Sequence, residues 1–354
     1  MRARVLTILL LALWPLGARA ERRPPAREPH LHGSAAVKGG RLLNLARRAG
    51  DLSAGLSALG LGHLPEKQAL GAARRRMDLS QPDHDRAYEA IKQFRRAAFS
   101  DEHYGAWVRA AVKGMRKNAR RTLVQLSASE VDRFVATAAA EHLDLDGIDL
   151  LMSVRRDKLA APGDLAGTLR TNARVVGLDV VGAETGTHDP AALNQALDVL
   201  LASGRRRTVL RVHAGEGFLG AHGHDNVNLV LGTLVERSAR TDLSGVRVIL
   251  AHVARVRDPK AAARDLLALK RRGVRVEVNV NPLSNLMYRA VDRLEDIAAL
   301  RLGVPLVPGS DNVGTLAQNA RILRLLVRGE GARAADLARH VVGLRDRWRA
   351  AGAP

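Results

Sequence analysis

The amino-acid sequence predicts an α/β fold, a (β/α)8 TIM-type barrel in which eight parallel strands form a closed cylinder surrounded by helices. Short runs of β-branched and other apolar residues alternate with longer stretches in which apolar residues recur every three or four positions. This alternation is typical of a parallel sheet covered by helices. The chain has 354 residues, of which 46% are hydrophobic, enough for one such barrel. A doubly wound open sheet is the alternative, but no glycine-rich phosphate loop follows the first strand.

Eight runs are expected to be strands because each is short, apolar and bounded by polar or turn-forming residues. They are Arg27 to His32, Thr122 to Leu126, Ile148 to Ser153, Val175 to Val181, Thr208 to His213, Val246 to His252, Val274 to Asn279 and Val304 to Pro308. Three expected helices between them have apolar residues at clear helical spacing. These are Leu193 to Leu201, Ala261 to Arg271 and Leu316 to Arg328. The order of the elements predicts a single barrel domain over residues 21–354.

The interval from Gly33 to Arg121 separates the first expected strand from the second. Structureless loops of this length are uncommon inside compact domains. We therefore expect residues 33–121 to include an insertion of several helices, which could form a cap or lid.

The first twenty residues have the pattern of a secretory signal peptide. Arg2 and Arg4 precede an apolar stretch from Val5 to Leu16, and Ala18-Arg19-Ala20 has the small-residue pattern of a cleavage site. The apolar stretch is shorter than the roughly 20 residues that a membrane-spanning helix needs. The sequence predicts a protein exported to the periplasm or secreted, with its mature chain beginning near Glu21 and no transmembrane anchor.

The composition excludes several kinds of site. The chain has no cysteine, so it has no disulfides, thiolate nucleophiles or cysteine-ligated zinc. The formal charge is +20, and removal of the three arginines within residues 1–20 lowers it to +17. Such a charge suits anionic partners, but the basic residues are dispersed and aromatic residues make up 3% of the chain. We therefore expect a small-molecule substrate and no specific nucleic-acid partner.

Titratable side chains occur at the expected C-terminal ends of the strands, where barrels of this kind place their active sites. The fifth strand ends in His213, and Gly215 allows a tight turn that directs Glu216 into the same cleft. The sixth strand runs into His252 and the eighth is followed by Asp311. Any one of these residues could be an ordinary core or capping residue, but their order along the chain indicates a shared site.

The first strand contributes two further histidines. His30 and His32 lie on the same face because alternate residues of a strand do, so both could bind one ion. Imidazole and carboxylate groups on neighbouring strand ends are suitable ligands for zinc. The sequence therefore predicts a metal site formed without cysteine.

In their order, these motifs resemble those of the adenosine deaminase family of the amidohydrolase superfamily, over most of the chain that follows the leader. The motifs are His30-Leu31-His32-Gly33-Ser34, Asp179-Val180-Val181-Gly182-Ala183-Glu184, His213-Ala214-Gly215-Glu216, Ala251-His252, Asn281-Pro282-Leu283-Ser284-Asn285 and Ser310-Asp311-Asn312. The His-Ala-Gly-Glu motif is quite specific, whereas the others count mainly through their order. The resemblance implies a barrel hydrolase that removes ammonia from an aminopurine nucleoside.

The resemblance also implies one zinc ion held by His30, His32, His213 and Asp311, with an activated water completing its coordination. Zinc lowers the pKa of its bound water toward ~7, which supplies hydroxide at neutral pH. Asp311 would orient that water as well as bind the metal.

The remaining roles concern proton transfer and the substrate. By resemblance, His252 would accept a proton or steady the hydroxide, because an imidazole has a suitable pKa. Glu216 would donate a proton to the ring nitrogen beside the attacked carbon. The backbone amide of Gly182 and the side chain of Asn312 would bind the purine edge. Independently of the resemblance, Asn281 to Asn285 is expected to form a structural turn, because Pro282 ends the seventh strand and asparagine suits turn positions.

The first strand departs from the family pattern, in which two residues separate the second histidine from a glycine. Here Gly33 follows His32 directly. If two residues are deleted, His30 and His32 are both ligands; if none is deleted, His30 is the second ligand and Glu28 replaces the first. We favour the histidine pair because both are nitrogen ligands on one strand face. The shortened turn also removes a segment that helps contact the sugar in the family.

Two other departures bear on the substrate. Asn312 stands where the family usually has a second aspartate, and an amide cannot supply a carboxylic proton. His252 lies between Ala251 and Val253 rather than beside a glycine. We therefore predict adenosine as the first substrate to test, with another amino-heterocycle as the alternative. From a different functional class, a catalytically degenerate purine-binding barrel would lack tightly bound zinc.

Overall fold

The computed structural model describes residues 27–37, 39–78, 84–155, 165–181, 187–216, 223–287, 290–311 and 315–342. The expected signal peptide, residues 1–20, lies outside these ranges. Within them, no helix combines the length and the apolar composition that crossing a membrane requires.

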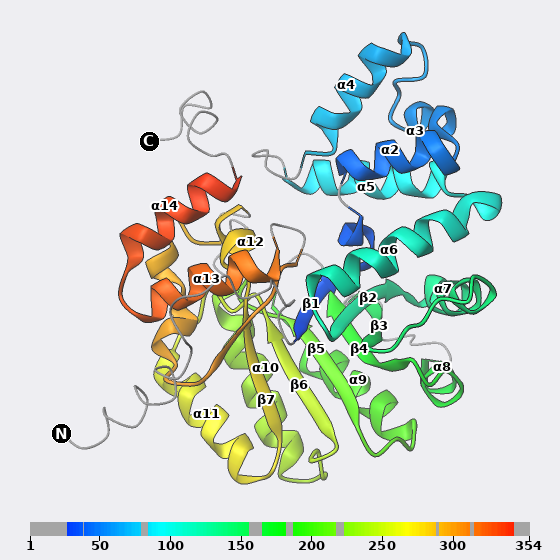
Figure 1. The fold of residues 1–354 in the computed structure, drawn as a ribbon. Helices are drawn as coiled ribbons and strands as arrows, with labels where there is room; N and C mark the ends of the chain where they lie inside the picture. Colours follow the sequence, from blue (N-terminus) through cyan, green and yellow to red (C-terminus); the bar gives the residue numbers. More distant parts are fainter. Residues whose placement is uncertain are drawn as a thin grey trace.

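Eight parallel strands form one sheet in the order of the sequence, which confirms the predicted barrel (Figure 1). The strands are β1 (Glu28–His32), β2 (Thr122–Ser127), β3 (Ile148–Arg155), β4 (Val175–Val181), β5 (Thr208–His213), β6 (Val246–Ala251), β7 (Arg275–Val280) and β8 (Leu306–Pro308). A bridge between Leu31 and Asp311 joins β1 to the end of β8, where Asp311 N donates to His30 O at 2.9 Å. This contact brings the first and last strands together.

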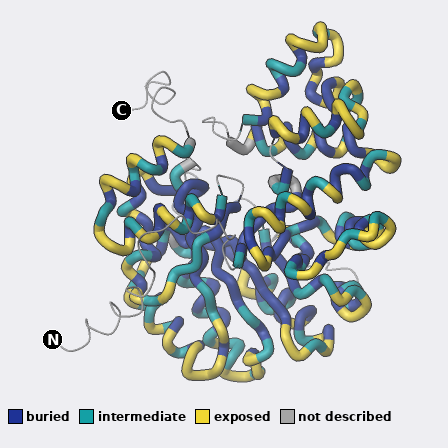
Figure 2. Tube along the Cα trace, viewed as in Figure 1, coloured by how far each residue is buried: buried dark blue, intermediate teal, exposed yellow. Residues whose placement is uncertain are grey.

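Helices pack around the strands and leave their outer faces exposed, while the strands are buried along most of their length (Figure 2). The helices that follow β2 are α7 (Ala128–Ala140), α8 (Leu165–Thr171), α9 (Pro190–Ala202), α10 (Gly223–Ser238), α11 (Pro259–Arg271), α12 (Pro282–Met287), α13 (Leu316–Val327) and α14 (Gly331–Val342), with 3-10 turns η4 (Leu294–Asp296) and η5 (Ala298–Arg301). The main core contains apolar residues from both the strands and these helices.

Several boundaries differ from the sequence-based expectation because capping residues start helices before the apolar spacing begins. Asp189 and Asp258 cap α9 and α11, and each is followed by proline at the first helical position. The prediction of a turn over residues 281–285 was wrong. Asn285 N donates to Asn281 O at 2.8 Å, which is the first hydrogen bond of the short helix α12. Pro282 fits there because the first helical position needs no amide donor.

The segment between β1 and β2 is largely helical. It comprises η1 (Gly33–Ala36), α2 (Gly39–Ala49), α3 (Leu52–Ala58), α4 (Glu66–Arg76), α5 (His84–Ala98), η2 (Asp101–His103) and α6 (Tyr104–Asn118). Figure 1 shows α2 to α5 beyond the end of the barrel at which β7 runs into α12. This insertion therefore lies on the side where the strands end.

Helix α5 is attached to the barrel by a partly buried ion pair. Arg95 donates to Glu130 at the start of α7, and its guanidinium lies 4.7 Å from the ring centroid of Trp107 on α6. Ser127, at the end of β2, donates to the other oxygen of Glu130 at 3.0 Å. Burial alone would raise the pKa of Glu130, but the charge of Arg95 lowers it below its ordinary value.

We expect Glu130→Gln to lower the free energy of unfolding by about 2 kcal/mol at neutral pH, because it leaves the buried Arg95 without its charge partner. The carboxylate contributes fully above its unfolded pKa near 4.5, and the contribution is lost as the pH falls through its lowered folded pKa. Urea unfolding of parent and variant at a series of pH values measures the difference, which should shrink below about pH 4.5. Glu89→Gln, which removes the exposed partner of Lys92, is the control; an equal loss there would contradict the assignment.

Candidate active site

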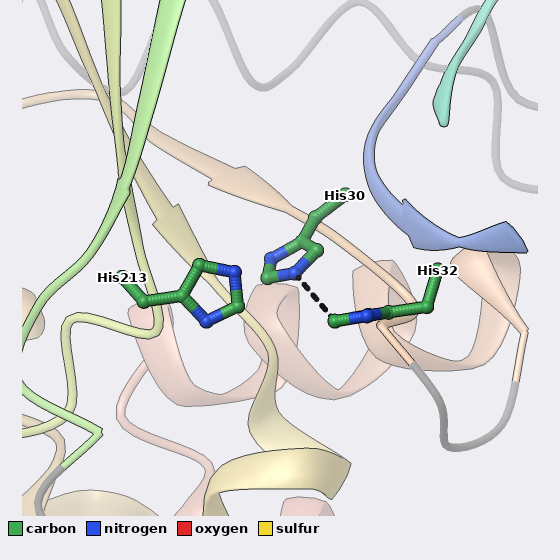
Figure 3. Close-up of side chains that lie close together, drawn as sticks. All are labelled: His30, His32 and His213. Atoms are coloured by element: carbon green, nitrogen blue, oxygen red, sulfur yellow. Dashed lines mark hydrogen bonds between the residues drawn. The ribbon is translucent and has the colours of Figure 1, made fainter. Parts of the chain in front are cut away.

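Four histidines and one aspartate meet at the end of the barrel where the strands finish. His30 and His32 end β1, His213 ends β5, His252 follows β6, and Asp311 follows β8. All five are buried. The possible ligand atoms of His30, His32 and His213 lie within 4.8 Å of one another, as do those of His30, His252 and Asp311. Figure 3 shows His30 between His213 and His32.

The shortest distances in this cluster join both histidines of β1 to one carboxylate oxygen. His30 Nε2 lies 3.3 Å from His32 Nε2 and 3.5 Å from Asp311 Oδ1, and His32 Nε2 lies 2.8 Å from the same oxygen. Two nitrogens bound to one tetrahedral zinc at about 2.0–2.1 Å would be separated by about 3.3 Å. The spacing of the two histidines suits such an ion.

Glu28 is fully buried, but its carboxylate bonds to groups outside the cluster of ligand atoms. Its carboxylate accepts hydrogen bonds from Ser310 N at 3.1 Å, from Ser310 Oγ, and from Asn118 Nδ2 at 2.8 Å. Burial raises the pKa of Glu28 to about 7 despite these bonds. Of the two alternatives for the first strand, the structure brings His30 and His32 to the cluster, while Glu28 joins β1 to the end of β8.

The turn after β5 places Glu216 between two histidines. Glu216 Oε2 lies 3.6 Å from His213 Nδ1, and Oε1 lies 3.6 Å from His252 Nδ1. The turn depends on Gly215, whose φ of 81° lies in the left-handed region, and a Cβ there would come within 2.5 Å of Arg255 O. The glycine therefore has the role that the sequence predicted for it.

His252 and Asp311 have left-handed backbone conformations, with φ of 63° and 48°. Among the described residues, the other non-glycine with positive φ is His142, which is exposed. Such conformations cost on the order of 1–3 kcal/mol and are commonly found at functional sites. They direct the side chains of two strand ends into the cluster.

Polar residues of β7 and α12 hold the rings and the carboxylate. His30 Nδ1 lies 3.2 Å from Asn279 Oδ1, which can accept the Nδ1 proton when Nε2 binds a metal. Asn281 Nδ2 lies 3.1 Å from His30 Nδ1 and 3.3 Å from His252 Nδ1. Ser284 Oγ donates to Asp311 Oδ2.

A fully buried ion pair lies behind His213. Arg211 donates through Nε to Asp179 Oδ1 at 2.9 Å and through Nη2 to Oδ2 at 2.6 Å, and its Nη1 donates to Pro29 O at 2.9 Å. Asp179 Oδ1 also lies 3.5 Å from His213 Nε2. The pair connects β4, β5 and β1 inside the barrel and fixes one side of the His213 ring.

We expect Arg211→Met to lower the free energy of unfolding by about 3–5 kcal/mol, because it leaves the Asp179 charge buried without its bidentate partner. Chemical denaturation of the parent and the variant measures the loss. The double variant Arg211→Met with Asp179→Leu should recover part of it, since replacing both charges removes the uncompensated group. A single variant as stable as the parent would contradict this reasoning.

The histidines of the cluster have different proton affinities. Burial, together with the charge of Arg211, holds the pKa of His30 well below its usual range. Burial would also lower the pKa of His213, but the charge of Asp179 outweighs it and raises the pKa to about 9. Burial lowers the pKa of His252, although neighbouring carboxylates oppose this. The pKa values of these histidines therefore differ because their charged neighbours differ.

Charged neighbours lower the pKa values of the carboxylates. Burial alone would raise the pKa of Glu216 and of Asp311, but His252 lowers both, and His32 adds to the effect on Asp311. The pKa of Asp179 lies well below its ordinary value because the charge of Arg211 outweighs the effect of burial. Negative charge is therefore concentrated beside the imidazoles, as a bound cation requires.

Six of the eight residues predicted for the site fall within the described ranges, and the structure brings all six together. The two predicted substrate contacts, Gly182 and Asn312, lie outside the described residues. The sequence motifs assigned no part in the cluster to several polar residues that support it, although three of them, Asp179, Asn281 and Ser284, lie within those motifs. The supporting residues are Tyr88, Asp179, Arg211, Asn279, Asn281 and Ser284.

The donor set fits a divalent metal that prefers nitrogen and oxygen ligands. Asp311 Oδ1 is buried and accepts no well-aligned hydrogen bond from the part of the chain that the structure describes, yet it lies within 3.5 Å of the Nε2 atoms of His30 and His32. Imidazoles and a carboxylate converging on one point form the type of site that binds zinc. Glu216 and His252 lie beside that point and can exchange protons with a bound molecule.

No family model matches the chain, and comparison with curated proteins gave no significant match. Among solved structures, the chain resembles the adenine deaminase of Arthrobacter aurescens, with a TM-score of 0.55 and 18% identity over 91% of this chain and 99% of the other. It also aligns with an amidohydrolase from Burkholderia ambifaria with bound Zn (TM-score 0.43, 15% identity, 94% and 97% covered) and with N-isopropylammelide isopropylaminohydrolase from Burkholderia multivorans (0.40, 17%, 71% and 64%). The first likeness establishes a shared fold, and the other two are too distant to add to it.

Proposed function

We propose that this protein is a zinc-dependent hydrolytic deaminase of an aminopurine nucleoside, with adenosine as the first candidate substrate. The observation that carries the proposal is the convergence of imidazoles and carboxylates where the strands of the barrel end. The shared fold with a protein named adenine deaminase supports it. Hydrolysis would replace the exocyclic amine of the purine with oxygen from water and release ammonia and inosine.

One zinc ion would be held by His30, His32, His213 and Asp311. When bound, zinc supplies Lewis acidity and lowers the pKa of water toward neutrality. The site has the two features that a zinc ion needs. It offers nitrogen and oxygen ligands, and neighbouring groups hold the ligands in place, as Asn279 does for the ring of His30.

The residues beside the metal ligands would move the protons. His252 would accept a proton from the attacking water. Glu216, in its protonated form, would donate a proton to the ring nitrogen next to the attacked carbon. The 3.6 Å between His252 Nδ1 and Glu216 Oε1 is close enough for the two groups to act on the same substrate ring. Asp311, held by Ser284, would orient the water. Gly182 and Asn312 would bind the purine edge.

Another amino-heterocycle, such as a free nucleobase, is the second candidate substrate. The 3-10 turn η1 begins at Gly33, directly after His32, so the chain lacks a longer loop at this point. Gly33 packs closely on β2, where a Cβ would lie 2.9 Å from Gln125 O. A substrate without a sugar would need fewer contacts here.

Export remains part of the proposal. Residues 1–20 would direct the chain out of the cytoplasm and be removed near Glu21, so the enzyme would act on extracytoplasmic substrate. Mass determination of the N-terminus of protein recovered from a secretion-competent host tests this directly. An intact Met1 in the recovered protein would overturn it.

Ammonia release from adenosine and from adenine by the zinc-loaded protein tests the proposed reaction. Release from adenosine would support the first candidate, and release from adenine alone would support the second. If zinc is bound but neither compound is deaminated, the aminopurine assignment is wrong, and other amino-heterocycles are the next substrates to test. If no zinc is bound, the chain is better explained as a degenerate binding barrel.

A further inference from the structure

The helical insertion contacts the metal-binding cluster through Tyr88 of α5. Tyr88 Oη lies 3.2 Å from His32 Nδ1, and the two rings meet edge to face with centroids 5.7 Å apart. The other ring nitrogen of His32 faces the carboxylate of Asp311. His32 is therefore held from the barrel on one side and from the insertion on the other.

This arrangement differs from that of His30, whose outer nitrogen contacts Asn279 of the barrel strand β7. His30 is fully buried, whereas the side chain of His32 is 11% exposed. A histidine that binds a metal through Nε2 needs its Nδ1 proton to be accepted by a neighbouring group, which fixes the tautomer and the ring plane. Tyr88 Oη is placed to accept that proton from His32.

The position of Tyr88 is itself tied to the barrel through α5. Arg95 lies seven residues further along the helix, two turns away, and so projects from nearly the same face. Its ion pair with Glu130 attaches this part of α5 to α7. Lys92, between them, places Nζ 4.9 Å from the centroid of the Tyr88 ring. The helix is thus joined to the barrel at one end and to His32 at the other.

We propose that Tyr88 is a positioning residue whose hydroxyl fixes the ring of His32 and thereby makes the metal affinity of the centre depend on the helical insertion. The inference deepens the proposed function, and it requires only that His32 bind a divalent metal. It assigns Tyr88 no contact with substrate and no part in the chemical step.

Tyr88→Phe tests this inference because it keeps the ring packing and removes the hydroxyl. We expect the affinity for Zn²⁺, measured by competition with a chelator, to fall about 10- to 100-fold. The visible spectrum of the Co²⁺-loaded variant should also change, because the His32 ring is less constrained. A variant with the affinity and spectrum of the parent would overturn the inference.

Tyr104→Phe is the matched control. It removes a hydroxyl from another tyrosine of the insertion, one that is buried, has no hydrogen-bond partner among the described residues and packs against Trp107. Zn²⁺ affinity should be unchanged in this control. Equal losses in both variants would indicate general loosening of the insertion and would count against a specific role for Tyr88.

Because both readouts use the metal alone, failure of this inference is distinguishable from failure of the proposed reaction. A parent that binds Zn²⁺ tightly but releases no ammonia would refute the aminopurine deaminase proposal, while the affinities still decide the role of Tyr88. A parent with no affinity for Zn²⁺ or Co²⁺ would refute both. Thermal unfolding of the two variants shows whether either has lost its fold.

Discussion

Glu216→Gln is expected to lower turnover by about 10²- to 10⁴-fold, the usual contribution of a positioned acid or base, while leaving bound zinc in place. The side chain is buried between His213 and His252, and its oxygens lie 3.6 Å from a ring nitrogen of each. Glutamine has nearly the same shape but cannot donate a carboxylic proton. Steady-state ammonia release and metal content of the same preparation measure the two effects separately.

Glu236→Gln is the matched control, because it makes the same substitution at an exposed position of α10. It should retain both turnover and metal. Undiminished turnover in the Glu216 variant would falsify the proposed proton donor. Loss of zinc together with turnover would instead show that this carboxylate supports the metal directly.

The parts of the fold that follow from local patterns were predictable from the sequence. The buried parallel strands correspond to short apolar runs in the sequence, and all eight lie close to their predicted boundaries. The turn at Gly215 was predictable because its left-handed conformation favours glycine. The placement of His213 and His252 followed from a general property of barrels, in which every strand ends at the same face.

The supporting polar residues could not be recognised in this way. Arg211 alternates with apolar residues of β5, a pattern that also describes a side chain facing solvent. Its burial depends on Asp179, which lies 32 positions earlier on the neighbouring strand. No local sequence pattern indicates that two such residues form an ion pair inside a closed barrel.

Tyr88 presented a related difficulty. Its contact with His32 joins residues 56 positions apart and depends on how the insertion packs on the barrel. Helical periodicity indicates which residues share a face of α5, but not what that face contacts. The misjudged turn at Asn281 has a local cause, since proline and asparagine suit both turns and the first turn of a helix.

Asp311→Asn is expected to abolish tight zinc binding. The loss of zinc affinity should exceed the factor of about 10 to 100 that is typical when a residue contacting a metal ligand is removed. The carboxylate oxygen Oδ1 lies within 3.5 Å of the Nε2 atoms of His30 and His32, so its charge is the nearest one to their shared point. Asparagine tolerates the left-handed backbone at this position, with φ of 48°, about as well as aspartate does. Zinc affinity measured by chelator competition would therefore report the lost charge and not a rearranged backbone.

Comparison with Asp311→Ala separates charge from backbone strain. Alanine also removes the ligand but adopts the left-handed conformation less readily, so this variant should lose both metal binding and folding stability. If asparagine retains zinc while alanine loses it, the residue acts mainly by shaping the strand end. If both lose zinc and only alanine loses stability, the negative charge itself binds the metal, because the two variants differ in backbone preference and share the missing carboxylate.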